Sequence, residues 1–550
     1  MRIVRFISAA IAALIIGTSA LAQSRDFNLG RNLDIQYSIL KSLSASYVDS
    51  LDFNKIIPSG ISAMLSSLDP YTTYIPESAE EDFEMMTTGA YGGIGAIIRK
   101  SVDGGVIIDE PYEGSPAAKA GLEPGDTIWE VDGRTVVGET SEQATSRMKG
   151  MPGTDVVFHV VKARTGDTVD IRVKRERIHI SDIACSGILR DSIGVISVSG
   201  FTDKMSEDFR KEFISLRERG AKRLVIDLRG NGGGLMDEAV KLLSLFVPKG
   251  TMVVSSRGRE ERMNSQLYTE TEPIDTEMPI LVLVNSQTAS SSEIVTGALQ
   301  DLDRAVVAGG RTFGKGLIQS VVETPYDGKL KLTTGKYYTP SGRCLQAIDY
   351  SHRNEDGSVG AIPDSLRHTF YTLHGRTVQD GGGITPDIKV DAREYSRPVL
   401  ALYYSQIPQQ YAIEYYRTHN EIAPADQFAL SDEEYEEFVR WAAERDFDFR
   451  SSAETLIAQL RKAIESDGLQ DSYGSDVEEL ASRFKLDKIT LLHLLKDDIR
   501  PLVEQEIIAR YYYSAAGNWF ATKNETQLLK ALDRWLSGEV ILIPENNQNK

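Results

Sequence analysis

The chain has 550 residues, of which 41% are apolar and two are cysteines. At roughly 100 to 200 residues per domain, this length predicts about three or four domains with a sizeable buried core, and it excludes a small disulfide-stapled scaffold. The 80 acidic side chains outnumber the 61 basic ones and give a net charge of −19. Because nonspecific nucleic-acid binding needs clustered Lys and Arg, this balance argues against a nucleic-acid partner.

The first segment has the pattern of a secretory signal. Arg2 and Arg5 precede the apolar stretch Phe6 to Ala22, which ends in Ala-Leu-Ala. A basic start, an apolar middle and small residues at the end predict cleavage after Ala22 and a periplasmic or secreted mature protein. The apolar stretch is near the lower length for crossing a bilayer, so an uncleaved membrane anchor is the alternative.

Two regions of different character follow. In the N-terminal helical region, residues 23–88, apolar side chains recur every three or four positions from Leu33 to Leu68. This spacing predicts two short helices with a break near Pro58. Residues 89–175 carry clustered glycines between short β-rich runs, which predicts a small β-rich module.

Residues 176–398 alternate apolar strands with helices, which indicates an α/β core in which helices cover a sheet. The clearest strands are predicted at 193–198, 224–228 and 280–284, with helices at 203–219, 235–246 and 290–299. Residues 399–550 have helical spacing of Leu and Ala and predict a C-terminal helical region.

Three kinds of chemistry lack support. Gly309 to Lys315 match the first seven positions of a phosphate-binding P-loop, but Gly316 stands where a magnesium-holding Ser or Thr is required, so we expect no nucleotide cofactor. The seven histidines have no zinc-motif spacing, so we expect no metal. Cys185 and Cys344 lack a catalytic signature, and the sequence leaves open whether they form a disulfide or remain as buried thiols.

A serine cluster is the best candidate nucleophile. Thr288 to Ile294 follow a predicted strand and open a predicted helix, so the Ser290 hydroxyl would lie beside backbone N–H groups. The structural alternative is a helix cap, because Ser290 and Glu293 also fit a capping box. Taken alone, the serine cluster favours the cap.

Lys315 strengthens the catalytic interpretation if it lies beside Ser290. A neutral lysine in a desolvated site can take the serine proton and return it to a leaving amine without any histidine. Gln319 could orient that amine, or it could be an ordinary polar strand residue. The glycine-rich element Asp227 to Gly234 could bring backbone N–H groups, together with that of Ser291, close to a substrate oxyanion.

The assembled motifs resemble the carboxyl-terminal processing peptidases, the tail-specific serine proteases with a Ser/Lys dyad. The resemblance spans about residues 33–390. It includes the Asp227 to Gly234, Thr288 to Ile294 and Thr312 to Gly316 elements. It implies a crotonase-like α/β fold with Ser290 as nucleophile, Lys315 as general base and Gln319 as its partner. It also implies oxyanion donors at Gly234 and Ser291 and structural support from Asp301. Ser291 departs from the alanine expected there but keeps the backbone donor.

The same resemblance implies that residues 89–175 are a PDZ domain, whose loop amides at Gly93, Ile94, Gly95 and Ala96 would receive a ligand carboxylate. We therefore expect an exported serine endopeptidase that acts on proteins with apolar carboxyl termini. A noncatalytic peptide-binding scaffold is the alternative. For residues 399–550, outside the resemblance, we expect packing on the core or pairing of subunits, with adaptor binding as a further possibility.

Overall fold

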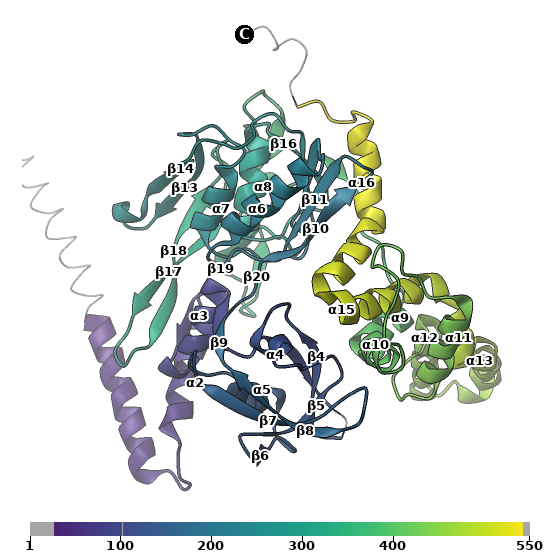
Figure 1. Ribbon diagram of the computed structural model, residues 1–550. Helices are drawn as coiled ribbons and strands as arrows, with labels where there is room; N and C mark the ends of the chain where they lie inside the picture. The colour runs from purple at the N-terminus through teal and green to yellow at the C-terminus, as the bar shows by residue number, and fades with distance from the viewer. Residues whose placement is uncertain (1–26, 102, 543–550) are drawn as a thin grey trace, which may run out of the picture. The chain divides into compact units, whose positions relative to one another are not determined.

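The computed structural model describes residues 27–101 and 103–542 (Figure 1). The predicted signal peptide, residues 1–22, lies outside these residues. The chain forms two compact units, Met1–Tyr74 and Ile75–Lys550. Within the described ranges, no helix is both long and apolar enough to cross a membrane.

The first unit contains a helix at 27–46 and α2 (Phe53–Ser66). The break predicted near Pro58 is wrong, because Pro58 lies inside α2. The chain instead breaks at 47–52, where the Asp52 side chain accepts the Asn54 amide and caps α2. Helix α2 continues through Pro58, although a proline removes a backbone donor and crowds the carbonyl four residues before it. Strand β1 (Thr73–Ile75) follows at the boundary between the two units.

The second unit begins with short helices η1 (Glu77–Ala79) and α3 (Glu80–Thr88) and continues into the predicted β-rich module. Its antiparallel sheet has the order β3-β4-β5-β7-β8, β6 pairs with β5, and β2 pairs separately with β9. The strands are β2 (Ala90–Gly93), β3 (Ala96–Lys100), β4 (Val106–Pro111), β5 (Thr127–Val131), β6 (Arg134–Thr135), β7 (Asp155–Val161), β8 (Thr168–Lys174) and β9 (Glu176–His179), and the helices are α4 (Pro116–Lys119) and α5 (Ser141–Met148). Alternate residues of β7 point inward, so the module has its own apolar core.

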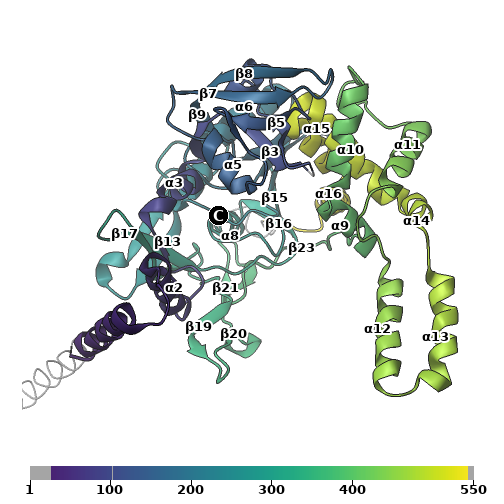
Figure 2. The same cartoon turned by 90° about the horizontal axis from the view of Figure 1, so that it is seen from below.

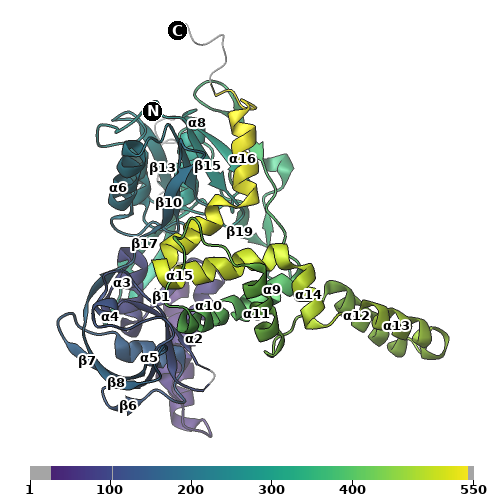
Figure 3. The same ribbon diagram turned by 45° about the vertical axis from the view of Figure 1, so that its right-hand side comes forward.

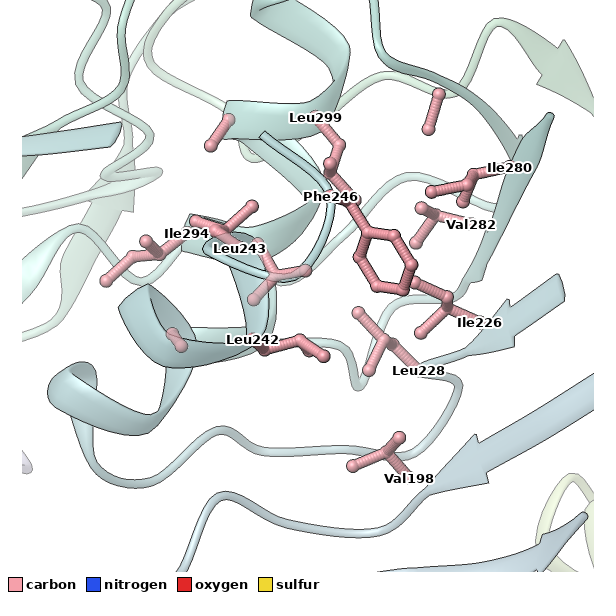
Figure 4. Close-up of a cluster of buried hydrophobic side chains, with 14 of the residues drawn as sticks. Val198, Ile226, Leu228, Leu242, Leu243, Phe246, Ile280, Val282, Ile294 and Leu299 are labelled. Carbon is pink, nitrogen blue, oxygen red and sulfur yellow. The ribbon is translucent and has the colours of Figure 1, made fainter. Parts of the chain in front are cut away.

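The α/β core contains a mostly parallel sheet in the order β10-β11-β12-β15-β16-β23, in which only β10 runs antiparallel to its neighbour. Its strands are β10 (Ile183–Leu189), β11 (Ile193–Val198), β12 (Arg223–Asp227), β15 (Ile280–Val284), β16 (Ala305–Gly309) and β23 (Ile388–Lys389). The central strands are almost continuously apolar because both faces of the sheet are covered. Helices α6 (Met205–Glu218), α7 (Met236–Leu243) and α8 (Ser291–Asp301) cover one face. There, the Phe246 ring packs against Ile226, Leu228 and Val282 (Figure 4).

A second antiparallel sheet flanks the core. Strand β18 pairs with β17 and β13, and β13 pairs with β14. These strands are β13 (Met252–Gly258), β14 (Ser265–Tyr268), β17 (Leu317–Glu323) and β18 (Lys329–Tyr338), with η2 (Glu261–Met263) between β13 and β14. Two small hairpins and η3 (Asp364–Leu366) follow: β19 (Ile348–Arg353) with β20 (Val359–Ala361), and β21 (Thr369–Tyr371) with β22 (Thr377–Gln379).

The C-terminal region is helical, as its apolar spacing predicts. Its helices are α9 (Arg397–Tyr404), α10 (Ile407–Thr418), α11 (Asp432–Ala443), α12 (Ser452–Ser466), α13 (Gln470–Phe484), α14 (Lys488–Leu494), α15 (Lys496–Lys523) and α16 (Thr526–Leu536). Helices α12 and α13 form an antiparallel hairpin that projects beyond the other C-terminal helices (Figures 2 and 3). Helix α15 is kinked at Tyr512 and Tyr513, and the Ser514 amide after the kink donates to Glu110 of β4 at 2.9 Å.

Helix α16 covers the second face of the central sheet. Its buried side chains Leu528, Ala531 and Leu532 join a cluster formed by the strands on that face. This packing explains the apolar spacing at the end of the chain. If α16 were absent, one face of strands β12, β15 and β16 would be exposed to water. The expected packing of the C-terminal region on the core is therefore present.

We expect Leu532→Ala to destabilise the core by about 2–5 kcal/mol, because it deletes a fully buried side chain and leaves a cavity under the sheet. Urea unfolding followed by tryptophan fluorescence measures this change, since Trp519 and Trp535 pack on the same cluster. Leu536→Ala, at an exposed position one turn further along α16, is the matched control and should have little effect. Equal midpoints for the two variants would contradict this role of α16.

Cys185 and Cys344 are both free thiols, so the disulfide left open by the sequence is not formed. Cys185 lies on β10 and is buried, and the Thr522 hydroxyl lies 3.5 Å from its sulfur. Burial raises the pKa of the Cys185 thiol to about 11, so it remains protonated and unreactive at neutral pH.

Candidate active site

Ser290 lies at the turn between β15 and α8, as predicted, with a backbone φ of 58° and ψ of −119°. A positive φ is costly for a residue with a Cβ and persists only where the surroundings impose it. A hydrogen bond to the glycine-rich element holds this turn in place, because the Ala289 amide donates to the Asn231 carbonyl at 3.0 Å. Ser290 thereby lines a cavity of about 380 Å³ at the N-terminus of α8.

Lys315 and Gln319 line the same cavity, although they follow Ser290 by 25 residues or more in the chain. Lys315 lies between β16 and β17, and its glycine neighbours are required by close packing. A Cβ on Gly314 would lie 2.5 Å from that of Ala347. Gln319 lies on β17 directly after a β-bulge, which changes the direction of its side chain, and it donates to the Thr333 hydroxyl at 3.3 Å.

Glu293 connects the turn that carries Ser290 (residues 285–290, the serine turn) to the loop that carries Lys315 (residues 310–316, the lysine loop). One carboxylate oxygen, Oε2, accepts the backbone amides of Ser290 (3.0 Å) and Lys315 (2.8 Å). The other, Oε1, accepts the Thr312 hydroxyl (2.6 Å) and the Gly314 amide (2.8 Å). This single side chain therefore fixes the spacing of the two backbone segments that carry the candidate dyad.

Burial makes Glu293 electrostatically unusual. Its side chain is inaccessible to solvent, and this desolvation raises the pKa of Glu293 to about 7 in spite of the four hydrogen bonds to its oxygens. The sequence indicated only its capping-box contact with Ser290. Its bonds to the lysine loop come from residues 19 to 22 positions away and had no sequence signal.

The glycine-rich element lies against the serine turn. A Cβ on Gly233, which has a φ of +94°, would lie 2.7 Å from the Ser290 Cβ and 2.8 Å from the Ser291 amide nitrogen, so only glycine fits. The Gly233 carbonyl accepts the Phe201 amide, and the Leu235 amide donates to the Phe201 carbonyl. The N–H and C=O groups of Gly234 therefore point to the opposite side. On that side the Gly234 carbonyl accepts the Ser291 hydroxyl at 2.8 Å. Both predicted oxyanion donors, Gly234 and Ser291, line the cavity.

Asn231 shapes this oxyanion loop, which we define as residues 229–234. It is fully buried, its amide nitrogen donates to the Val198 carbonyl at 2.8 Å, and its side-chain oxygen accepts the Gly233 amide at 2.8 Å. Its backbone carbonyl accepts the Ala289 amide. Sequence reasoning treated Asn231 only as part of a glycine run and missed this role.

Two further residues brace α8. The buried Tyr337 hydroxyl donates to the backbone carbonyls of Ser290 (3.2 Å) and Lys315, so β18 also links the two segments. Asp301, at the end of α8, forms a buried ion pair with Arg343 at 2.7 Å and accepts the Ser341 amide at 3.0 Å. Asp301 is absent from the cavity lining, and its contacts are those of a structural support.

The cavity walls are largely apolar. Phe83 and Met86 of α3 contribute one wall, and Leu317, Ile318 and Val321 of β17 contribute another. Lys331 of β18 is the second lysine of the lining. Lys315 shares this lining with the apolar side chains.

The predicted carboxylate loop of the β-rich module lies between β2 and β3. Gly93 ends β2, Ile94 is buried in the module core, Gly95 has a φ of +74° and Ala96 begins β3. Burial raises the pKa of the Tyr91 phenol to about 12, and the nearby backbone of Gly95 and Ala96 opposes this rise.

In residues 27–101 and 103–542 no group of three or more His, Cys, Asp or Glu side chains has the arrangement of a metal site.

Residues 192–352 match the family described as Peptidase family S41, residues 107–162 match a PDZ domain, and residues 399–534 match the "Probable PDZ-protease, C-terminal helical domain". The chain is 33% identical over 342 residues to a carboxy-terminal-processing protease of Bartonella bacilliformis, in an alignment that covers 61% of this chain and 78% of the relative. The chain belongs to peptidase family S41.

This S41 peptidase is also 30% identical over 365 residues to a probable CtpA-like serine protease of Staphylococcus aureus, with 66% of each chain covered. A solved photosystem II D1 C-terminal processing protease is 26% identical, with a TM-score of 0.34 and coverage of 64% of this chain and 88% of the other.

The S41 peptidase is thus a carboxyl-terminal processing serine protease with a PDZ domain, a crotonase-like α/β core and a C-terminal helical domain. The family, fold class and enzyme class predicted from the motifs are confirmed. Neither the nucleotide-binding alternative nor the noncatalytic scaffold is retained.

Proposed function

We propose that this S41 peptidase cleaves polypeptides with Ser290 as nucleophile and Lys315 as general base. The observation that carries this assignment is the shared carboxylate of Glu293, which binds the backbone amides of both residues at the rim of one cavity. The apolar walls of that cavity and the adjoining oxyanion loop supply the other requirements of such a dyad.

The reaction follows from this arrangement. The neutral Lys315 amine takes the proton of the Ser290 hydroxyl as its oxygen bonds to the scissile carbonyl carbon. The negative charge that develops on the carbonyl oxygen is stabilised by the amides of Gly234 and Ser291. The lysine then gives its proton to the leaving amine, which departs and leaves an acyl ester on Ser290. Water, deprotonated by the same lysine, hydrolyses the ester and restores the enzyme. Gln319 orients the lysine amine.

The PDZ domain supplies substrate selection in this proposal. An extended carboxyl-terminal tail adds beside a strand of such a domain, and loop amides receive its carboxylate. Gly93, Ile94, Gly95 and Ala96 form the matching loop, and the apolar side chains around it favour nonpolar terminal residues.

The proposed location is the periplasm or the extracellular space, on the basis of the signal pattern at residues 1–22. A homo-oligomer or an adaptor bound to the C-terminal helical domain is compatible with this setting. The α12–α13 hairpin exposes apolar side chains, such as Leu456 and Tyr473, that are available for such a contact.

The test uses the full-length chain expressed with its own leader and recovered from the exported fraction, where its first residue should be Gln23. An unfolded substrate with an apolar free carboxyl terminus should be cleaved at least about tenfold faster than the same substrate with an amidated terminus, because the amide loses the charge that the loop binds. The rates are compared as kcat/KM by quantitative gel or mass spectrometry. Equal rates for the two substrates would remove tail recognition from the proposal but leave the peptidase chemistry intact.

A further inference from the structure

The first side chain of the oxyanion loop is anchored in an unusual way. Arg229 directly precedes the glycines, and its guanidinium donates through Nε (3.0 Å) and Nη2 (2.7 Å) to the two carboxylate oxygens of Asp227. Its backbone amide donates to the same carboxylate at 3.1 Å. The Arg229 side chain and the start of the loop therefore move together.

The remaining partners of Arg229 come from the C-terminal helical domain. Its Nη1 donates to Glu525 Oε2 and, at 3.0 Å, to Gln527 Oε1. Glu525 is itself fixed as the N-cap of α16, because its carboxylate accepts the amides of Gln527 (2.8 Å) and Leu528 (2.9 Å). The Gln527 side chain is anchored by donation to the Val390 carbonyl at 2.7 Å.

These contacts are charged and partly buried, because the exposed fraction is 16% for the Arg229 side chain and 28% for that of Glu525. Burial by itself would lower the pKa of Arg229, but Asp227 and Glu525 outweigh it and raise this pKa above its ordinary value. Burial would likewise raise the pKa of Glu525, but Arg229 holds it below its ordinary value. A partly buried guanidinium that loses one acceptor is left with an unsatisfied donor, which favours its displacement toward water or another acceptor.

We infer that Glu525 and Gln527 are positioning residues for the oxyanion loop, so that the last helix of the C-terminal domain completes the active site of the peptidase core. The inference rests on the proposed function, in which Gly234 supplies an oxyanion donor. Asp227 ends β12 and Arg229 begins the loop, so a displaced guanidinium shifts the backbone that leads to Gly234. Oxyanion donors act only at hydrogen-bond distance from the developing charge, and displacements of about 1 Å cost on the order of 100-fold in rate.

Glu525→Ala should therefore lower kcat by about 10- to 100-fold and leave KM within about twofold, because the substrate is bound elsewhere and only transition-state stabilisation is lost. Affinity for a peptide boronic acid, which forms a tetrahedral adduct on the serine, should fall by a similar factor. Glu525→Gln, which keeps an oxygen for the helix cap, is the second variant in case the alanine form folds poorly.

Asp533→Asn is the matched control. It removes another ion pair between α16 and the core, from Asp533 to Arg190 at 2.7 Å, but this pair is exposed and lies away from the loop. It should leave kcat and boronate affinity unchanged. Equal decreases in kcat in the Glu525 and Asp533 variants would show general destabilisation and overturn the inference. A lower kcat accompanied by a changed KM and a lower thermal stability would do the same.

Hydrogen–deuterium exchange separates this inference from the proposed function. The amides of residues 230–234 should exchange faster in Glu525→Ala than in the intact protein and in Asp533→Asn. Unchanged exchange would overturn the positioning role whatever the activity. Faster exchange in a protein whose cleavage does not depend on Ser290 would support the positioning role and instead refute the proposed chemistry.

Discussion

Ser290→Ala and Lys315→Ala should each reduce kcat/KM by at least about 10³-fold, because one removes the attacking oxygen and the other removes the group that takes its proton. The double variant should be no worse than either single variant, since the two side chains act in one step and their effects are not additive. Initial rates on an unfolded substrate with a free apolar tail measure all three proteins, and circular dichroism verifies that they are folded.

Lys331→Ala provides the matched control for the lysine. Lys331 lines the same cavity as Lys315 but lies on β18 and is absent from the Glu293 hydrogen-bond network. Its removal should change kcat/KM by less than about tenfold. A loss equal to that of Lys315→Ala would reassign the base, and cleavage that survives in Ser290→Ala would show that Ser290 is not the nucleophile.

Glu293→Gln is expected to reduce kcat/KM by at least about 100-fold, although the two side chains have the same shape. Each carboxylate oxygen of Glu293 accepts two donors. A glutamine has one such oxygen, and its NH₂ group would face two donors on the other side. Unsatisfied buried donors cost about 1–3 kcal/mol each, which is sufficient to separate the serine turn from the lysine loop.

Glu238→Gln controls for the loss of any buried glutamate in this core. Glu238 is also almost inaccessible to solvent, and it accepts the Ser206 amide and hydroxyl away from the active-site cavity. It should preserve kcat/KM to within about tenfold. Comparable activity losses in the two variants would mean that Glu293 contributes to core stability alone.

The pH profile gives an independent measurement of Glu293. Its carboxylate is the form that accepts four donors, and burial raises its pKa to about 7, so it becomes protonated as the pH falls through neutrality. Lys315 must also be deprotonated to act as a base. On the acid limb, the logarithm of kcat/KM should therefore rise with a slope approaching two in the intact enzyme and one in the residual activity of Glu293→Gln. A slope of one in both proteins would exclude an essential ionised Glu293.

Local patterns in the sequence predicted much of the core. The strand predicted at 280–284 coincides with β15, and that at 193–198 coincides with β11, because continuous apolar runs bounded by turns have few other solutions in a parallel sheet. The prediction of a break near Pro58 was wrong because Pro58 lies inside α2, and the Asp52 side chain instead caps the helix where it begins.

The sequence by itself determined the order of the domains and pointed to the residues of the proposed dyad, because motifs such as Ser290 with its helix and Lys315 between two glycines are short and local. Only the tertiary structure decided which distant groups complete the site. Glu293 reaches the lysine loop, and Glu525 reaches Arg229 from almost 300 residues further along the chain. Such contacts depend on how the whole chain packs, since a buried hydrogen bond joins atoms that are close in space and carries no signature of their separation in sequence.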